Sequence, residues 1–323
     1  MPNVRRPKRG SRAFYPRTRA SRPYPRIEKW PRSNEVKPLG VAGYKAGMTH
    51  AMAIDTNTNS KTKGQLISRP VTVLDCPPLS VFGFKAYSNT TQGLKCIADV
   101  LASNLDKNLG RKFAAKKIKP LDEQLKRLDG QRLSSVRLLV HTKPGFKKTP
   151  EAFELAIGGP AEKQLEYAKN VLGKELRATD VLKEGDFTDV FSITSGHGFE
   201  GPVNRFGIRV HSRKAQQMAR KVGGKGTTSP GKVRSTVPQA GQHGWQSRME
   251  FNKKIMKIAK PEDVTPAGGF LRYGKASGDA VLLEGSVAGP AKRLIRLRSP
   301  MRPPKTKYPV DIRLISKESK QGV

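Results

Sequence analysis

Residues 196–260 constrain the fold of this chain more than any other stretch. They contain fourteen Lys or Arg residues and ten glycines, but only two acids, Glu200 and Glu250. Few apolar runs before Ile255 are long enough to form a core strand or helix. A net charge of +12 with so little to bury cannot fold compactly by itself, because too little buried surface offsets the lost chain entropy. The stretch therefore predicts a large polyanionic partner.

Two terminal segments share this excess of charge. Residues 1–32 carry eleven basic residues and one acid, and residues 291–323 have a net charge of +8. Together with residues 196–260 they hold +30 of the chain's +36, so the apolar-patterned parts between them are near charge balance. Such an excess repels itself unless a partner supplies negative charge. The distribution predicts a globular body with several basic arms.

Nucleic acid and an anionic membrane are the two candidate partners. No run of about 18 apolar residues is present, so we expect no membrane span, and the basic N-terminus lacks the apolar segment of a signal peptide. The arms are broken by proline and glycine and offer no broad apolar helix face for a membrane surface. Cys76 and Cys96 are too few for a disulfide framework, which favours a cytosolic location and small core side chains.

The N-terminal arm, residues 1–32, contains six prolines and almost no apolar periodicity. Proline fixes φ and removes a donor, so we expect an extended arm without helix or strand. Nine of its eleven basic residues are Arg, interleaved with aromatic residues. Guanidinium groups pair with phosphates and aromatic rings stack on bases, which favours RNA. A basic tail without a specific partner is the alternative interpretation.

The body has the pattern of short strands. We expect a strand at 41–44, a turn at 45–47 and a second strand at 48–55, followed by 69–74 with 81–87 as its partner. Alternation of apolar residues also predicts a strand at 133–141, and apolar residues indicate further strands at 187–194, 255–259, 270–273, 280–284 and 294–297. Short strands punctuated by Gly and Pro are typical of a barrel or a sandwich.

The middle of the chain has a helical pattern. Leucines of residues 120–128 and apolar residues of 160–172 each fall on one helical face, with Pro160 at a first helical position and Gly173 as a stop. We therefore expect an α/β insertion at 97–186 within a discontinuous body formed by 33–96, 187–195 and 255–300. Residues 301–323 form a basic C-terminal tail.

No constellation of residues predicts catalysis, a cofactor or a metal. The five histidines are scattered, and none lies beside a cysteine at metal-ligand spacing. Gly223-Gly224-Lys225-Gly226-Thr227 differs from a phosphate loop because Gly follows the Lys and no apolar strand precedes it. We therefore expect a protein that is not an enzyme.

The 196–254 segment should leave one sheet and return to it, because strands are predicted on both sides. A long loop without its own core is usually functional, and its glycines permit close approach of the backbone. A short helix within 213–221 is expected from its helix-forming residues. Trp245 either stacks on a base or anchors the loop locally. Extended arms suit a folded RNA better than duplex DNA, which is usually bound by a rigid helix or ribbon.

Several motifs resemble one known family. Gly43-Tyr44-Lys45-Ala46-Gly47-Met48-Thr49-His50 is similar to the N-terminal barrel signature of ribosomal protein L-three, in its archaeal and eukaryotic form. Further matching motifs occur in the family's order over nearly the whole chain: Trp30-Pro31, Gly196-His197-Gly198-Phe199-Glu200-Gly201-Pro202-Val203, Arg234-Ser235-Thr236-Val237-Pro238, Gly241-Gln242-His243-Gly244-Trp245 and Gly268-Gly269-Phe270.

The resemblance implies a mainly β fold: a six-stranded translation-type β-barrel with an α/β insertion, an N-terminal arm and a long internal loop. It also implies a structural role in the large ribosomal subunit, early binding in assembly, and a loop that approaches the peptidyl-transferase region. The implied partners are large-subunit rRNA and neighbouring ribosomal proteins, with no membrane and no free homo-oligomer. The rRNA-binding residues expected on these grounds are Arg5, Arg6, Arg9, Arg12, Arg17, Arg19, Arg22, Trp30, Lys45, His197, Arg205, Arg209, Arg213, Lys214, Arg220, Lys221, Lys225, Lys232, Arg234, Gln242, His243, Trp245 and Arg248.

The sequence departs from the family at one turn. Relatives often have a tryptophan two residues before the position of Pro230, whereas Thr228 stands here, and Trp245 replaces a frequent tyrosine. No aromatic role is therefore transferred to this turn, where the backbone, Lys225 and Lys232 are the candidates. Two other functions stay open at this point: an RNA-modifying enzyme and a general nucleic-acid compactor.

Overall fold

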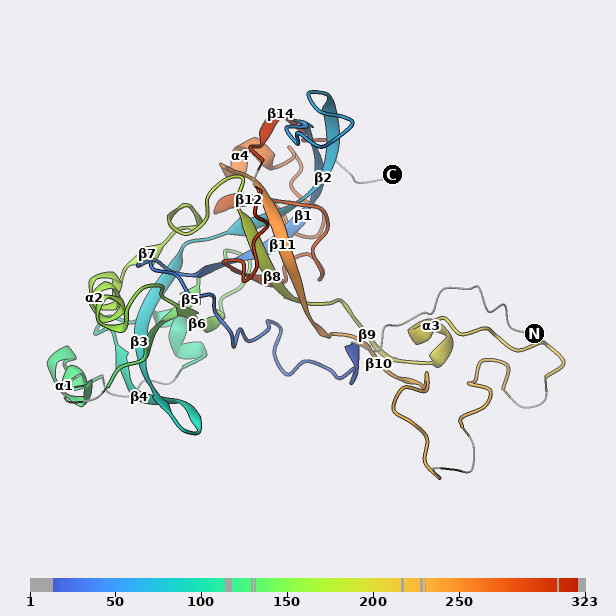
Figure 1. Ribbon diagram of the computed structural model, residues 1–323, viewed down its shortest axis with the longest axis horizontal. Helices are drawn as coiled ribbons and strands as arrows, with labels where there is room; N and C mark the ends of the chain where they lie inside the picture. Colours follow the sequence, from blue (N-terminus) through green and yellow to red (C-terminus); the bar gives the residue numbers. More distant parts are fainter. Residues whose placement is uncertain are drawn as a thin grey trace. The chain divides into compact units, whose positions relative to one another are not determined.

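The computed structural model describes residues 14–113, 118–128, 130, 132–215, 218–226, 229, 231–306 and 308–318. The chain divides into two compact units, shown in the ribbon of Figure 1. The larger one, here called the body, comprises Tyr24–Ser192 and Met249–Val323. The smaller one, the arm–loop unit, comprises Met1–Pro23 and Ile193–Arg248. The N-terminal arm and the long loop thus belong to one unit.

A seven-stranded sheet forms one half of the body. Its strand order is β13–β8–β11–β12–β2–β1–β14, and β13 also pairs with β1. The pairings with β1 and β2 are antiparallel, as are those of β11 with β12 and of β13 with β8. Its strands are β1 (Gly40–Ile54), β2 (Leu66–Cys76), β8 (Phe187–Ile193), β11 (Ser247–Ala259), β12 (Asp279–Glu284), β13 (Leu294–Arg298) and β14 (Asp311–Ile315).

A five-stranded antiparallel sheet forms the other half. Its order is β4–β3–β5–β6, and β7 pairs with β3. The strands are β3 (Leu79–Thr90), β4 (Gly93–Leu101), β5 (Ser135–Thr142), β6 (Ala152–Ala156) and β7 (Glu175–Leu176). Helix α2 (Ala161–Val171) packs against β5 and α1 (Leu121–Leu125) against β4 (Figure 1). Shorter helices are η2 (Lys107–Arg111), η3 (Lys126–Leu128), η4 (Ala178–Asp180) and α4 (Pro261–Val264).

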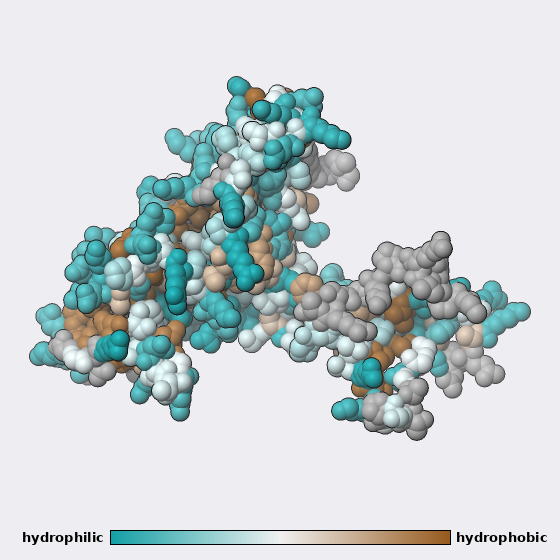
Figure 2. Space-filling model, in the orientation of Figure 1, coloured by the Kyte–Doolittle hydropathy of each residue, from teal (hydrophilic) through white to brown (hydrophobic). Residues whose placement is uncertain are grey.

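One hydrophobic cluster joins the two sheets. Tyr44 and Leu74 of the first sheet and Phe84 and Leu138 of the second are fully buried within it. The alternation predicted for 133–141 is confirmed, because Val136, Leu138 and Val140 all point into this core. Hydrophilic residues cover much of the visible surface of the body (Figure 2). The chain is therefore mainly β, as predicted.

Several local predictions were wrong. The turn expected at 45–47 is a β-bulge inside the single long strand β1, because pairing with β2 holds the backbone on both sides of the register shift. Strand 69–74 pairs with β1 and β12 rather than with 81–87, which lies in the other sheet. Residues 270–273 form a turn closed by a bridge between Phe270 and Gly274 instead of a strand.

The ends of two elements also differ from the predictions. Helix α2 begins at Ala161, so Pro160 is its cap rather than its first residue, while Gly173 follows the helix at φ +77° as expected. The expected boundary between 96 and 97 falls inside β4. Residues 79–96 are therefore paired with the strands of the five-stranded sheet, and the division of the chain into domains stays a prediction.

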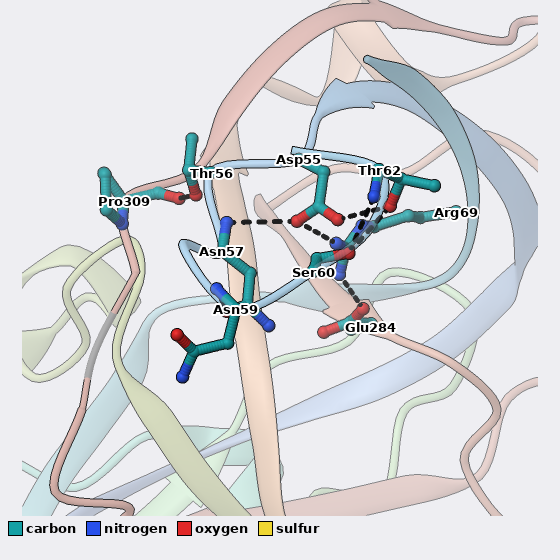
Figure 3. A network of polar contacts seen from close by, with 9 residues as sticks. All are labelled: Asp55, Thr56, Asn57, Asn59, Ser60, Thr62, Arg69, Glu284 and Pro309. Atoms are coloured by element: carbon teal, nitrogen blue, oxygen red, sulfur yellow. Dashed lines mark hydrogen bonds and ion pairs between the residues drawn. The ribbon is translucent and has the colours of Figure 1, made fainter. Parts of the chain in front are cut away.

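A polar network closes the hairpin between β1 and β2 (Figure 3). Asp55 accepts hydrogen bonds from the Asn57 amide at 3.1 Å and from Thr62 Oγ1 at 2.7 Å. Arg69 lies between Asp55, at 3.3 Å, and Glu284 of β12, at 2.5 Å. Hydrogen bonds led by those from Ser60 and Thr62 lower the pKa of Asp55 to about 2. The network links three strands through one arginine.

Two buried arginines of β13 hold the segment that enters the body from the N-terminal arm. Arg296 donates to the carbonyl oxygens of Pro25 (3.2 Å) and Glu154 (2.5 Å), and Arg298 donates to that of Lys29 (2.6 Å). Arg298 is also paired with buried Asp189. Burial lowers the pKa of Arg296 to about 10. These bonds fix residues 25–29 to the edge of β13.

In the described part of the chain, no helix is both long and apolar enough to cross a bilayer.

Candidate nucleic-acid interface

A short two-stranded sheet and one helix organise the arm–loop unit. Strands β9 (Gly196–Glu200) and β10 (Gly241–Gly244) pair antiparallel, with Gly241 opposite Glu200. Helix α3 (Pro202–Phe206) has a proline at its start and ends at Gly207, whose φ of +61° is the left-handed geometry that glycine adopts readily. The loop between β9 and β10 therefore starts and ends at this two-stranded sheet.

The arm and the loop share a small core, which the sequence did not predict. The Tyr15 ring stacks on Phe206 with centroids 6.0 Å apart, and the Arg17 guanidinium lies 4.5 Å from the Phe206 centroid. Phe206 and Pro202 are buried. The loop alone has too little to bury, and aromatic residues of the arm supply the missing surface. Among the described residues 14–32 of the arm, only Phe14 is helical and none belongs to a strand, and the extended arm stays a prediction.

Arg205 joins three parts of this unit. Its Nε donates to the Gln242 carbonyl at 3.0 Å, its Nη1 to Gln239 at 3.0 Å and its Nη2 to Arg17 at 3.3 Å. Desolvation, with a smaller contribution from Arg17, lowers the pKa of Arg205. Carbonyl oxygens thus occupy the fork of donors that a phosphate would otherwise take. Arg205 therefore has an architectural position, and its binding to RNA stays a prediction.

Trp245 anchors the arm to the loop. Its indole Nε1 donates to the Ala20 carbonyl at 2.9 Å, and the Ala20 amide donates to the Trp245 carbonyl at 2.8 Å. The side chain is half-buried, with the Arg19 guanidinium 5.9 Å from its ring. Of the two interpretations left open by the sequence, these contacts favour local anchoring.

Glu200 is the only acid of the arm–loop unit. It bonds to Nδ1 of His243 across the β9–β10 pair, and the His197 ring lies 5.0 Å from the His243 ring. The unit also contains eighteen Lys or Arg residues. With its one carboxylate already engaged, the unit has no acid left with which to neutralise its cations.

Most described cations of the predicted site fall into two sets. The inner set lies half-buried against protein groups: Arg17, Arg205 and Arg248, the last of which stacks on Phe14 at 4.4 Å and donates to Gln246 at 3.0 Å. The outer set is exposed, and its members form no ion pair with a described acid: Arg19, Arg22, Arg209, Arg213, Lys214, Arg220, Lys225, Lys232 and Arg234. The outer set is the candidate phosphate-binding surface.

Two predicted residues lie in the body instead. Lys45 donates to the carbonyl oxygens of Val287 (2.5 Å) and Gly289 (3.1 Å), and burial lowers its pKa. Trp30 packs against the core at Gly40, where the methyl group of an alanine would lie 3.1 Å from the Trp30 ring. The side chain of Gln242, in the arm–loop unit, donates within the loop to Gly244 at 3.2 Å. These three side chains are engaged by the protein itself.

Part of the prediction lies outside the described residues. Arg5, Arg6, Arg9 and Arg12 are in this category, as is most of the turn at 227–230. The prediction of a short helix within 213–221 was wrong for the described residues there, which form turns. The Lys221 carbonyl accepts a contact from His211 Nε2 at 3.1 Å, so the backbone there bonds to a side chain instead of continuing a helix.

Phe199 was missed as a candidate. It lies on β9 and is 80% exposed, the most exposed large apolar side chain of the described residues. An exposed aromatic ring on a glycine-rich strand, within a unit rich in cations, is a candidate platform for stacking an unpaired base. The signal was present in the Gly198-Phe199-Glu200 sequence, beside the predicted His197.

The chain is similar to known proteins over nearly its whole length. The family model described as "Ribosomal protein L3" matches residues 1–322. A protein of Methanobrevibacter smithii named "Large ribosomal subunit protein uL3" is 46% identical, over 98% of each chain. Proteins of the same name from Methanopyrus kandleri and Archaeoglobus fulgidus are each 44% identical, covering 99% and 98% of this chain and 93% and 98% of their own.

These matches show that the chain is an archaeal-type ribosomal protein. The chain belongs to the ribosomal protein L3 family. Membership of that family makes it a structural protein rather than an enzyme.

Proposed function

We propose that this chain is a structural constituent of the large ribosomal subunit and that its arm–loop unit binds large-subunit rRNA. The observation that carries the proposal is the ratio of eighteen cations to one acid in that unit, with the outer set exposed and Glu200 already bonded. The names of the archaeal relatives, which refer to the large subunit, support the assignment.

The proposed mechanism is neutralisation of phosphates by a preorganised surface. The inner set fixes the backbone of the arm and the loop, so the outer cations lose less entropy when they meet RNA. Each phosphate contact releases condensed counterions, which makes the affinity depend on salt. Exposed rings such as Phe199 add stacking on unpaired bases. Neighbouring ribosomal proteins would cover other parts of the surface.

We infer that the body contains the six-stranded translation-type barrel of the family. The pairing of β13 with both β1 and β8 supports this, because it connects the two ends of the order β8–β11–β12–β2–β1. The family resemblance further supports early binding in subunit assembly and a loop near the peptidyl-transferase region. The cellular location that follows from this function is the ribosome.

The test compares RNA with DNA. The full-length chain would be titrated with a large-subunit rRNA fragment and with duplex DNA of equal length, at several salt concentrations. We expect a clear preference for the RNA and a steep salt dependence. Equal affinity at matched salt would instead favour the general nucleic-acid compactor.

A reconstitution experiment tests the ribosomal role directly. The chain should co-sediment with large subunits assembled in its presence and resist a wash at moderate salt, because its arms would be enclosed by RNA. Ready loss in that wash would contradict the proposal. Turnover of transcribed rRNA, abolished by a mutation in the body, would revive the RNA-modifying enzyme.

A further inference from the structure

The body has an open pocket of its own. Its volume is about 620 Å³, within the range of typical ligand sites. It lies between β8, the start of β11, residues 26–29 and residues 298–302. None of its lining residues is among the predicted RNA-binding residues.

The floor of this pocket is unusually apolar for an exposed surface. Strand β11 alternates, so Met249 and Phe251 point to the same side, with 45% and 54% of their surfaces exposed. Met301 adds a third apolar side chain, 40% exposed, and buried Phe191 lies beneath. Exposure of a ring and two thioethers does not stabilise the fold, and a contiguous exposed apolar patch of this kind often marks a binding site. The surface suits a flat aromatic ligand.

The rim of the pocket is basic. Arg26, Lys29 and Arg302 are exposed there, and Glu28 is the only acid among the lining residues. The rim is also held in place: Asn252, at φ +53°, donates from Nδ2 to the Arg302 carbonyl at 2.9 Å. Arg298 fixes the Lys29 carbonyl from below. A ligand that combines an aromatic ring with negative charge matches this floor and rim.

Two polar atoms behind the wall, both shielded from solvent, have no hydrogen-bond partner among the described residues. They are Nε of Arg298, a donor, and Oδ1 of Asn252, an acceptor. Both side chains are otherwise bonded, so the free atoms are held in fixed positions. The bonded guanidinium and amide groups therefore give the pocket a rigid polar wall.

We propose that this pocket binds one unstacked nucleotide of single-stranded RNA. The base lies against Phe251 and Met249, and the flanking phosphates lie at Arg26, Lys29 and Arg302. The inference rests on the proposed RNA-binding function and adds to it a second contact, on the body, that recognises a base. Charge complementarity favours RNA over an apolar segment of another protein.

The test uses variants of Phe251 in the full-length chain. Phe251→Ala removes the ring, Phe251→Leu keeps an apolar side chain without a ring, and Phe251→Tyr keeps the ring. Leu314→Ala is the matched control, because Leu314 is a similarly exposed strand residue of the body, at 60%. Each is titrated with a short single-stranded RNA and with the same strand made abasic, at about 200 mM salt to reduce the phosphate contribution.

We expect Phe251→Ala and Phe251→Leu to weaken binding of the base-containing strand about tenfold, as is typical for loss of one stacking ring. Phe251→Tyr and Leu314→Ala should bind like the wild type. The abasic strand should bind all five proteins alike. Wild-type affinity of the Leu variant would overturn the proposal, because an apolar peptide accepts Leu but a base needs the ring.

A second measurement does not depend on the variants. Photocrosslinking of the wild-type chain to RNA containing 4-thiouridine should attach a nucleotide within residues 249–252, and crosslinks confined to other regions would overturn the proposal. The two levels of failure are distinguishable. If the wild type keeps its preference for rRNA but the Phe251 variants have no effect, only the pocket proposal fails. If that preference is absent, the proposed function fails as well.

Discussion

Trp245 and Ala20 exchange two hydrogen bonds across 225 residues of sequence, one through backbone atoms and one through the indole Nε1. The pair holds Trp245 at a φ of +53°, a conformation that a bulky residue rarely adopts. The arm and the loop are thus joined by a contact that combines hydrogen bonding with a strained backbone.

Replacement of Trp245 by Phe tests this contact. The ring stays but the Nε1 donor is lost, so the half-buried Ala20 carbonyl lacks its partner, at a cost of about 1 kcal/mol. Amide hydrogen exchange around residue 20 should become faster. Trp30→Phe is the control, because Trp30 Nε1 has no partner among the described residues and its loss should leave exchange unchanged.

Replacement of Arg205 by Lys should loosen the loop although the charge is kept. A single ammonium cannot reach the three carbonyl oxygens that the guanidinium bonds, so we expect a loss of about 1–3 kcal/mol in the stability of the unit. Limited proteolysis of the loop measures the effect. Arg209→Lys is the matched control, since Arg209 is exposed. Equal resistance of both variants would contradict the architectural position of Arg205.

Removal of outer cations should act on RNA binding instead. Combined replacement of Arg209, Arg213 and Arg234 by Ala should lower the salt slope of rRNA binding by about 0.7–0.9 for each phosphate that is no longer neutralised. The melting temperature should not change, because these side chains are exposed. An unchanged slope would show that they do not lie on phosphates.

Two glycines allow the cost of a steric collision to be measured separately from the cost of backbone strain. A methyl group on Gly244 would lie 1.9 Å from the Ser195 carbonyl oxygen at φ +69°, whereas at Gly198, φ +74°, it would meet open space. Gly198→Ala should cost only the left-handed penalty of about 1–2 kcal/mol. Gly244→Ala should cost more and disrupt the β9–β10 pairing, which hydrogen exchange of those strands would detect.

Acid should weaken the hairpin network through Asp55. Its pKa in the folded chain, about 2, is below the usual value of 3.8, so its stabilising contribution is complete above the usual pKa and is lost as the pH falls from there toward 2. Asp55→Asn removes this contribution. Urea unfolding should therefore separate the two proteins clearly at pH 7 and progressively less between about pH 4 and pH 2. A constant difference over that range would contradict the assignment.

The strands could be predicted where apolar residues alternate over a buried face, as at 133–141, or form a short continuous apolar run, as at 280–283, because both patterns are typical of buried strands. The bulge at Lys45 could not, since its sequence resembles a turn and only the neighbouring strands keep the backbone extended. The cationic surface followed from composition. The sequence could not show which arginines bond to the protein's own backbone and which stay exposed. Arg205 and Arg209 have the same chemistry and differ only in their tertiary neighbours.

The hydrogen bonds from Arg296 and Arg298 to residues 25–29 fix the point at which the N-terminal arm is attached to the body. The arm is thus a proposed RNA-binding segment tethered to the body. If the body binds RNA as proposed, the arm meets its own RNA contacts at an effective concentration in the millimolar range, as is usual for short linkers. Its cations then add avidity without a second diffusional encounter. Because Trp245 and Arg205 also bond the arm to the loop, a cut between residues 25–29 and the arm would leave this advantage partly in place.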